Sequence, residues 1–95
     1  MSFRFVGHGA PGTFQLNGEK INAAHFSNLH FVSRLQSLVE AAPSVELISC
    51  RVALGDVGRD FVRTFARAVG KPVFASSKYV GPASLGGTYF LDFGY

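Results

Sequence analysis

The stretch Val45-Glu46-Leu47-Ile48-Ser49-Cys50 is a short apolar run that leads into the one cysteine of this 95-residue chain. A second run, Phe3-Arg4-Phe5-Val6-Gly7, leads in the same way into His8-Gly9. Short apolar runs bounded by glycine and proline are typical of β-strands. If the two strands are parallel neighbours, their carboxyl ends lie at one edge of the sheet, where open α/β folds carry their chemistry. The sequence therefore predicts that His8 and Cys50 lie close together.

A β-hairpin is expected directly after the His8 loop. Thr13-Phe14-Gln15-Leu16 alternates polar and apolar residues, and Asn17-Gly18 is a strong two-residue hairpin turn. Glu19-Lys20-Ile21 is the short return strand. Asn22 then has the side chain to cap a first helical turn.

Apolar residues at helical spacing predict two amphipathic helices. The first ends at Pro43, and the second starts with Asp56 as its N-cap and closes at Gly70. A strand at 72–76, a loop at 77–87 and a final strand at 88–93 complete the chain. The apolar positions are Phe31, Val32, Leu35, Leu38, Val39 and Ala42 in the first helix, and Val57, Phe61, Val62, Phe65 and Val69 in the second.

This order of elements predicts one α/β domain over residues 1–95. Strands that alternate with helices indicate a three-layer, mainly parallel sheet flanked by helices on both faces. A content of 47% hydrophobic and 16% charged residues is that of a chain that folds around a core. With ten phenylalanines and no tryptophan, the aromatic residues are expected to be mainly packing material.

Composition also narrows the classes of function. One cysteine excludes an internal disulfide and leaves no CxxC metal signature, so neither a metal nor a cofactor is expected. His25 and His30 lack the i,i+4 spacing of helical metal ligands and are expected to have surface or cap roles. The basic residues behind the net charge of +3 lie largely on predicted helix faces. They lack the interleaved exposed aromatic residues of a surface that binds single-stranded nucleic acid, so no nucleic-acid partner is expected.

No apolar stretch is long enough for a membrane span, which needs roughly 18–20 residues. The N-terminus also lacks the apolar core of a signal peptide. As written, the chain is expected to be cytoplasmic. The alternative is a domain of a secreted bacterial protein, whose address is encoded elsewhere.

Cys50 has the surroundings that a nucleophilic thiol needs. Arg51 follows it, a predicted helix begins soon after, and His8 is expected across the strand ends. The backbone N–H groups of Gly9 and Cys50 can converge on one point, as the donors for a developing oxyanion do. By spacing alone, however, a lone cysteine after a buried strand is more often a small hydrophobe.

Three groups of motifs in the same order resemble the caspase-like cysteine peptidases, the group of caspases, gingipains, separases and legumains. The likeness is nearest to the autoprocessing cysteine protease domains of bacterial toxins and to a related domain of unassigned function in large adhesin-like bacterial proteins. It extends over residues 3–92. The stretches that carry it are Phe5-Val6-Gly7-His8-Gly9-Ala10-Pro11-Gly12 with Phe14-Gln15-Leu16, Glu46-Leu47-Ile48-Ser49-Cys50-Arg51-Val52-Ala53 with Gly58-Arg59-Asp60-Phe61, and Val73-Phe74-Ala75-Ser76-Ser77 with Leu85-Gly86-Gly87-Thr88-Tyr89.

The resemblance implies a cysteine peptidase that cleaves restricted sites, or its own parent chain within a bacterial toxin or surface protein. Cys50 would be the nucleophile, His8 its base, and Gly9 and Cys50 the oxyanion donors. The alternative is a catalytically silent caspase-like module for binding or assembly. The resemblance also implies a substrate-binding segment made of Ala75, Ser76, Ser77, Lys78 and Tyr79.

The sequence departs from this family in two respects. Ser49 stands where the family has glycine before the cysteine, and the family has about two further strands and a helix before the His strand. We therefore expect a second copy, or an N-terminal segment of a longer parent, to pair with the edge strand at 3–6. A basic patch offers a weaker hypothesis, an anionic activator such as the inositol phosphate that switches on some toxin protease domains. That patch consists of Arg59, Arg63, Arg67 and Lys71.

Overall fold

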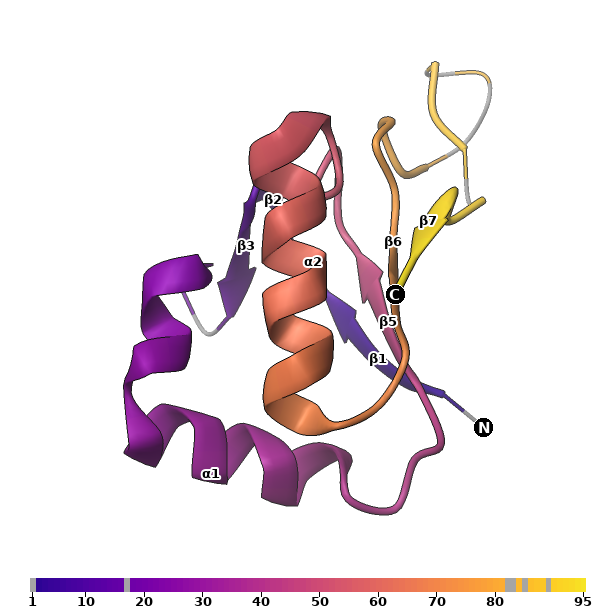
Figure 1. Cartoon of the computed structure of the whole chain (residues 1–95). Helices are drawn as coiled ribbons and strands as arrows, with labels where there is room; N and C mark the ends of the chain where they lie inside the picture. Colours follow the sequence, from indigo (N-terminus) through magenta and orange to yellow (C-terminus); the bar gives the residue numbers. More distant parts are fainter. Residues whose placement is uncertain (1, 17, 82–83, 85, 89) are drawn as a thin grey trace.

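The strands that end before His8 and before Cys50 are parallel neighbours, as predicted. In the computed structural model, β1 (Phe3–Val6) pairs in parallel with β5 (Val45–Ile48). On the other side of β5 lies the parallel strand β6 (Val73–Ala75), and β7 (Phe93–Gly94) adds an antiparallel edge. The sheet order β1-β5-β6-β7 confirms an α/β fold with a mixed sheet (Figure 1).

The structure describes residues 2–16, 18–81, 84, 86–88 and 90–95. The predicted hairpin is present, although Asn17 of its turn lies outside the described residues. The predicted last strand is wrong in extent, because Thr88 forms only an isolated bridge with Val80, Tyr89 lies outside the described residues, and β7 begins at Phe93. The remaining elements are β2 (Gly9–Ala10), β3 (Thr13–Leu16) and β4 (Glu19–Asn22) of a second, antiparallel sheet, the 3-10 helix η1 (Ala23–Ser27), and the α-helices α1 (Leu29–Val39) and α2 (Gly55–Val69).

Both α-helices lie on one face of the four-stranded sheet, so the predicted three-layer architecture is wrong for the described residues. The parallel strands succeed one another in a single direction, from β1 to β5 to β6. Because crossovers between parallel strands are right-handed, successive crossovers in one direction bring their helices to the same face. α2 runs across that face and contacts α1 (Figure 1).

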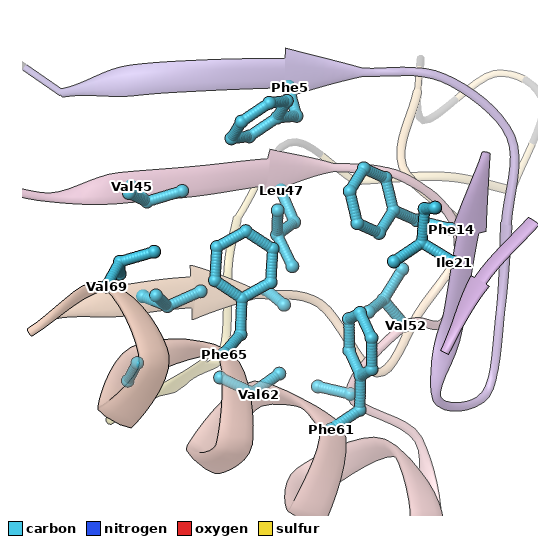
Figure 2. Close-up of a cluster of buried hydrophobic side chains, with 14 of the residues drawn as sticks. Phe5, Phe14, Ile21, Val45, Leu47, Val52, Phe61, Val62, Phe65 and Val69 are labelled. Atoms are coloured by element: carbon cyan, nitrogen blue, oxygen red, sulfur yellow. The ribbon is translucent and has the colours of Figure 1, made fainter. Parts of the chain in front are cut away.

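The core lies between this face and α2. Phe5 and Leu47 project from the sheet towards Phe65 of α2, and Phe14 of the hairpin closes the end of the core near Phe61 (Figure 2). The ring centroids of Phe5 and Phe65 are 6.1 Å apart, and those of Phe14 and Phe61 are 6.0 Å apart. Such tilted and edge-on ring pairs add stability beyond the burial of their area. Most of the phenylalanines are thus packing material, as the composition indicated, although Phe74 and Phe90 are exposed.

No helix of the described residues covers the opposite face of the sheet (Figure 1). The side chains that alternate with the core residues along each strand point to this face, and Val6 among them is 76% exposed. Arg4 Nε donates a 2.7 Å hydrogen bond to a carboxylate oxygen of Glu46 on the neighbouring strand. A hollow of 670 Å³ lies over this face, lined by Arg4, Val6, Glu46, Ile48, Phe74, Phe90 and Leu91.

The helix ends match the predictions in part. Asn22 accepts a hydrogen bond from the Ala24 N–H and caps η1, with His25 completing the capping box, as expected for both residues. The prediction of Asp56 as N-cap of α2 is wrong. The Gly58 N–H already reaches the carbonyl of Leu54, so Leu54 is the N-cap and Asp56 lies in the first turn.

Lys71 fixes the far end of α1 to the strand that follows α2. Its Nζ donates hydrogen bonds of 2.5–2.7 Å to three main-chain carbonyls at the carboxyl end of α1 and just beyond it, those of Val39, Glu40 and Ala42. The last carbonyls of a helix lack partners within it and carry partial negative charge, so an ammonium group there is favourable. This one side chain therefore joins two elements that are distant in sequence.

Candidate functional site

His8 and Cys50 occupy equivalent positions beyond two paired strands. Val6 of β1 is in register with Ile48 of β5, and each candidate lies two residues further along the chain. The Gly7 N–H donates to the Ile48 carbonyl at 3.4 Å, which extends the pairing past the strand ends. The His8 side chain is exposed, and Cys50 is partly buried. Both residues thus lie at the carboxyl edge of the sheet, as predicted.

Gly9 packs directly against the Cys50 turn. A Cβ at position 9 would lie 2.8 Å from the Cys50 carbonyl oxygen and 2.7 Å from the Ser49 Cβ. Real Cβ atoms essentially never come so close, so no other residue fits here without a shift of the turn. The backbone of Gly9 therefore lies beside the backbone of Cys50.

The Gly9 N–H is directed away from the hairpin. The Gln15 N–H donates to the His8 carbonyl at 2.7 Å, which makes His8 and Gln15 a hydrogen-bonded pair of the antiparallel ladder. Hydrogen-bonded and non-bonded pairs alternate along such a ladder. Gly9, paired with Phe14, is the next residue and is non-bonded, so its N–H points out of the hairpin. Among the backbone hydrogen bonds between described residues, the Cys50 N–H likewise has no acceptor.

The thiol of Cys50 contacts the loop that follows β6. Its Sγ accepts a hydrogen bond from the Val80 N–H at 3.4 Å, and the S–H donates to the Val80 carbonyl at 3.7 Å. Within the part of the chain that the structure describes, His8 and Cys50 share no hydrogen bond. An N–H donor at sulfur stabilises negative charge that develops there. No sequence signal pointed to Val80, because it contributes only backbone groups.

Arg51 holds the turn after Cys50 in a left-handed conformation. Its φ of 56° is uncommon for a residue with a side chain. The Arg51 N–H donates to the Lys78 carbonyl at 2.9 Å, and the guanidinium carbon lies 4.7 Å from the centre of the Tyr79 ring. Such outliers persist where surrounding contacts fix them, and they cluster at functional sites.

Two buried polar atoms flank Cys50. Ser49 is 1% exposed, and within the described structure neither its Oγ nor the Nε of Arg51 has a hydrogen-bond partner. A buried polar group without a partner costs roughly 1–3 kcal/mol. Ser49 stands where the resemblance leads one to expect glycine, and its hydroxyl makes this strand end less stable than it could be.

The segment expected to bind substrate divides into a buried and an exposed half. Ala75 and Ser76 are fully buried and present no surface to a ligand. Lys78 and Tyr79 are exposed beside the Cys50 turn. Ser77 lies between the two halves, and its N–H and hydroxyl both donate to the carboxylate of Asp92, at 2.8 and 2.5 Å.

The contacts of Asp92 lower its pKa. Partial burial opposes ionisation, but it is outweighed by the hydroxyl and the N–H of Ser77, by the Asp92 N–H and by the charge of Lys78. These contacts hold the pKa of Asp92 below its ordinary value of 3.8. The charged carboxylate thus fixes the loop on which Lys78 and Tyr79 stand, a role with no signal in the sequence.

A hollow of 450 Å³ lies beside His8, on the outer side of the hairpin. Cys50 is not among its lining residues, which are His8, Gly9, Ala10, Thr13, Gln15 and Lys20. The structure thus brings the backbones of Gly9 and Cys50 together, while His8 lines this hollow and the thiol bonds to Val80.

The residues expected to form an anion patch already have partners. Arg59 and Arg63 pair with Asp56 and Asp60 at 2.8 and 3.1 Å. Arg67 donates to the Tyr95 hydroxyl at 3.2 Å, and Lys71 caps α1. The anionic activator remains a prediction, and these pairings weaken its structural basis.

The described residues contain no group of three or more His, Cys, Asp or Glu side chains that could hold a metal ion. None of their helices is both long and apolar enough to cross a membrane.

No curated protein and no solved structure matches the chain significantly. A family model described as a domain of unknown function (DUF4347) matches residues 1–95, the whole length of the chain. The chain therefore belongs to the DUF4347 family.

Proposed function

We propose that this domain is a cysteine peptidase in which Cys50 is the nucleophile and His8 the proton carrier. The observation that carries the proposal is the fit of Gly9 against the Cys50 turn, at the ends of two parallel strands in register. Where the two backbones lie side by side, the Gly9 N–H points out of the hairpin ladder, and the Cys50 N–H has no backbone acceptor among the described residues. Paired donors of this kind are what the tetrahedral intermediate of acyl transfer requires.

The proposed reaction begins with transfer of the thiol proton of Cys50 to the His8 imidazole. The thiolate attacks the carbonyl carbon of a peptide bond, and the oxygen that becomes negative accepts hydrogen bonds from Gly9 and Cys50. The intermediate then expels the amine, which takes the proton from His8, and a thioester remains. Water hydrolyses this thioester, with His8 again accepting and returning a proton, to release the acid and free Cys50.

Substrate binding must bring the two side chains together. In the resting structure the thiol bonds to Val80, and the exposed imidazole is free to turn about its side-chain torsions. Catalytic hydrogen bonds are often long or absent until substrate is bound. Lys78 and Tyr79, exposed beside the Cys50 turn, are the residues best placed to contact the substrate.

A second candidate function, a silent binding or assembly module, is favoured by one observation. Both hydrogen-bonding capacities of the Cys50 sulfur are used by the main chain of Val80, so the thiol has the contacts of a structural residue. In that case Cys50 would only tie the end of β5 to the loop after β6. The two candidates differ in whether His8 affects the chemistry of Cys50.

The test is cleavage of a degenerate peptide library, with new amino termini detected by mass spectrometry. We expect wild type to cut at a restricted set of sequences, and Cys50→Ala and His8→Ala each to abolish cutting while remaining folded. His30→Ala is the matched control, because His30 is an exposed histidine on α1. Cleavage by Cys50→Ala equal to that of wild type would refute the proposal. Absence of cleavage by wild type, with folding intact, would favour the silent module.

A further inference from the structure

The outer face of the hairpin sheet lies beside the candidate site. Phe14 of β3 and Ile21 of β4 are buried and point into the core (Figure 2). Because side chains alternate along a strand, the residues next to them point to the opposite, outer face. The Gln15 N–H donates to the His8 carbonyl, and Gln15 is in register with Lys20. These three residues therefore form one row across the outer face, with His8 at one end and Lys20 at the other.

The 450 Å³ hollow over this row is lined by a cation and by neutral polar groups, with no carboxylate among its lining residues. Lys20 is exposed and makes no ion pair with any described residue. Its acidic neighbour, Glu19, pairs with His25 at 3.3 Å instead. The hydroxyl of Thr13 and the amide of Gln15 can hydrogen-bond to a peptide main chain. The hollow thus has the charge and the polar groups to hold a peptide segment that carries a carboxylate.

The proposed reaction requires the leaving half of the substrate to pass on the His8 side of the site. His8 gives its proton to the nitrogen of the departing amine, so this nitrogen must come within hydrogen-bond reach of the imidazole. β5, which leads to Cys50, lies between β1 and β6 in the sheet. His8, which follows β1, and the loop with Lys78 and Tyr79, which follows β6, are thus on opposite sides of Cys50. The residues after the scissile bond therefore cross the hairpin, and those before it lie at the loop.

We propose that Lys20 selects substrates with an acidic residue at the second or third position after the scissile bond, a specificity that rests on the peptidase function proposed above. His8 and Lys20 are separated by two strand spacings of ~4.8 Å, which places their Cα atoms about 10 Å apart. An extended peptide advances ~3.4 Å per residue and so covers this distance in about three residues. The long, flexible stem of lysine lets the ammonium meet a carboxylate at either position.

Cleavage of a degenerate peptide library reads this preference directly, because each new amino terminus begins the sequence that followed the cut bond. We expect Asp and Glu to be enriched about two- to fivefold at the second or third residue of the new termini, the range that an exposed ion pair gives. Lys20→Glu should replace this enrichment by one for Lys and Arg, whereas Lys20→Arg should keep it. Arg34→Glu is the matched control, because Arg34 is an exposed cation on α1 and its replacement changes the net charge equally.

Kinetics on two synthetic peptides give the same preference as a ratio. The peptides share one cleaved sequence and differ only in Glu or Gln at the enriched position. The Glu peptide should have the higher kcat/KM with wild type, by about two- to fivefold. In about 1 M NaCl, where the Debye length is about 3 Å, the ratio should approach one because the ion pair is screened.

The outcomes separate the role of Lys20 from the peptidase activity itself. Cleavage by wild type without acidic enrichment after the cut bond, or with an enrichment that Lys20→Glu leaves unchanged, would overturn the role of Lys20 and leave the peptidase intact. An equal loss of enrichment in Arg34→Glu would also overturn it, because net charge and not the hollow would then set the preference. Absence of cleavage by folded wild type would refute the peptidase, and the role of Lys20 with it.

Discussion

Replacing either of two buried serines beside the site with alanine should change the free energy of unfolding, and the two changes should have opposite signs. Ser49 and Ser76 are both fully buried, at 1% and 0% exposure. The Ser76 Oγ accepts a 3.0 Å hydrogen bond from the Lys78 N–H, whereas the Ser49 Oγ has no partner within the described structure. Removing an unpartnered hydroxyl relieves a penalty of roughly 1–3 kcal/mol, and removing a bonded one loses about 0.5–1.5 kcal/mol.

We therefore expect Ser49→Ala to raise the free energy of unfolding by about 1 kcal/mol. This gain lies at the low end of the relieved penalty because the packing contacts of the oxygen are lost as well. Ser76→Ala should lower it by a similar amount. In a domain of this size 1 kcal/mol corresponds to about 4–8 °C in Tm. Denaturation in urea, followed by far-UV circular dichroism, measures both variants under one condition. If Ser49→Ala is destabilised as much as Ser76→Ala, the Ser49 hydroxyl has a partner and our account of this strand end is wrong.

Three further predictions concern single contacts. Lys71→Met should lower the free energy of unfolding by about 2 kcal/mol, because charge-assisted hydrogen bonds to the end of α1 are lost. Lys20→Met is the control, because Lys20 is exposed. If urea denaturation shows equal effects for the two variants, the contact of Lys71 with α1 is contradicted. Asp92 has a lowered pKa, so its ionised form stabilises the fold above pH 3.8 and this stability is lost as the pH falls through the folded-state value. Wild type should thus exceed Asp92→Asn in stability at pH 6, and the gap should close below pH 3.8; a gap that persists at pH 2 would show that charge is not its source. Gly9→Ala should reduce the rate of Cys50 labelling by peptidyl electrophiles about 100-fold, since displacement of reacting groups by about 1 Å has that effect. The rate is measured by mass spectrometry, and an unchanged rate would show that Gly9 has no part in the reaction of Cys50.

The sequence was sufficient for both α-helices, the hairpin, the three parallel strands and the sheet edge that carries the candidate site, but not for the extent of the last strand. Apolar runs that end in Gly7 and Ser49 identified two strands, and their parallel pairing follows from the helix between them. The one-sided arrangement of the helices was not predicted. It depends on the strand order continuing in one direction, which periodicity does not encode.

The details of the site were less accessible to sequence reasoning. The contacts of Cys50 with Val80 use main-chain atoms, and any residue at position 80 except proline could make both of them. The left-handed backbone of Arg51 could not be predicted either, because arginine, unlike glycine, does not indicate a left-handed turn. Asp92 acts on Ser77 from 15 residues away, through a fold that brings them together.

The central claim, that His8 activates Cys50, is tested most directly by covalent labelling. Wild type, His8→Ala and the control His30→Ala would be treated with peptidyl electrophiles and with a small alkylating agent, and Cys50 adducts followed by intact-mass spectrometry. We predict rapid labelling of wild type and His30→Ala that depends on the peptide, and a collapse of this labelling in His8→Ala. Slow labelling that is indifferent both to the peptide and to His8 would contradict the claim and identify Cys50 as a structural residue of a binding module.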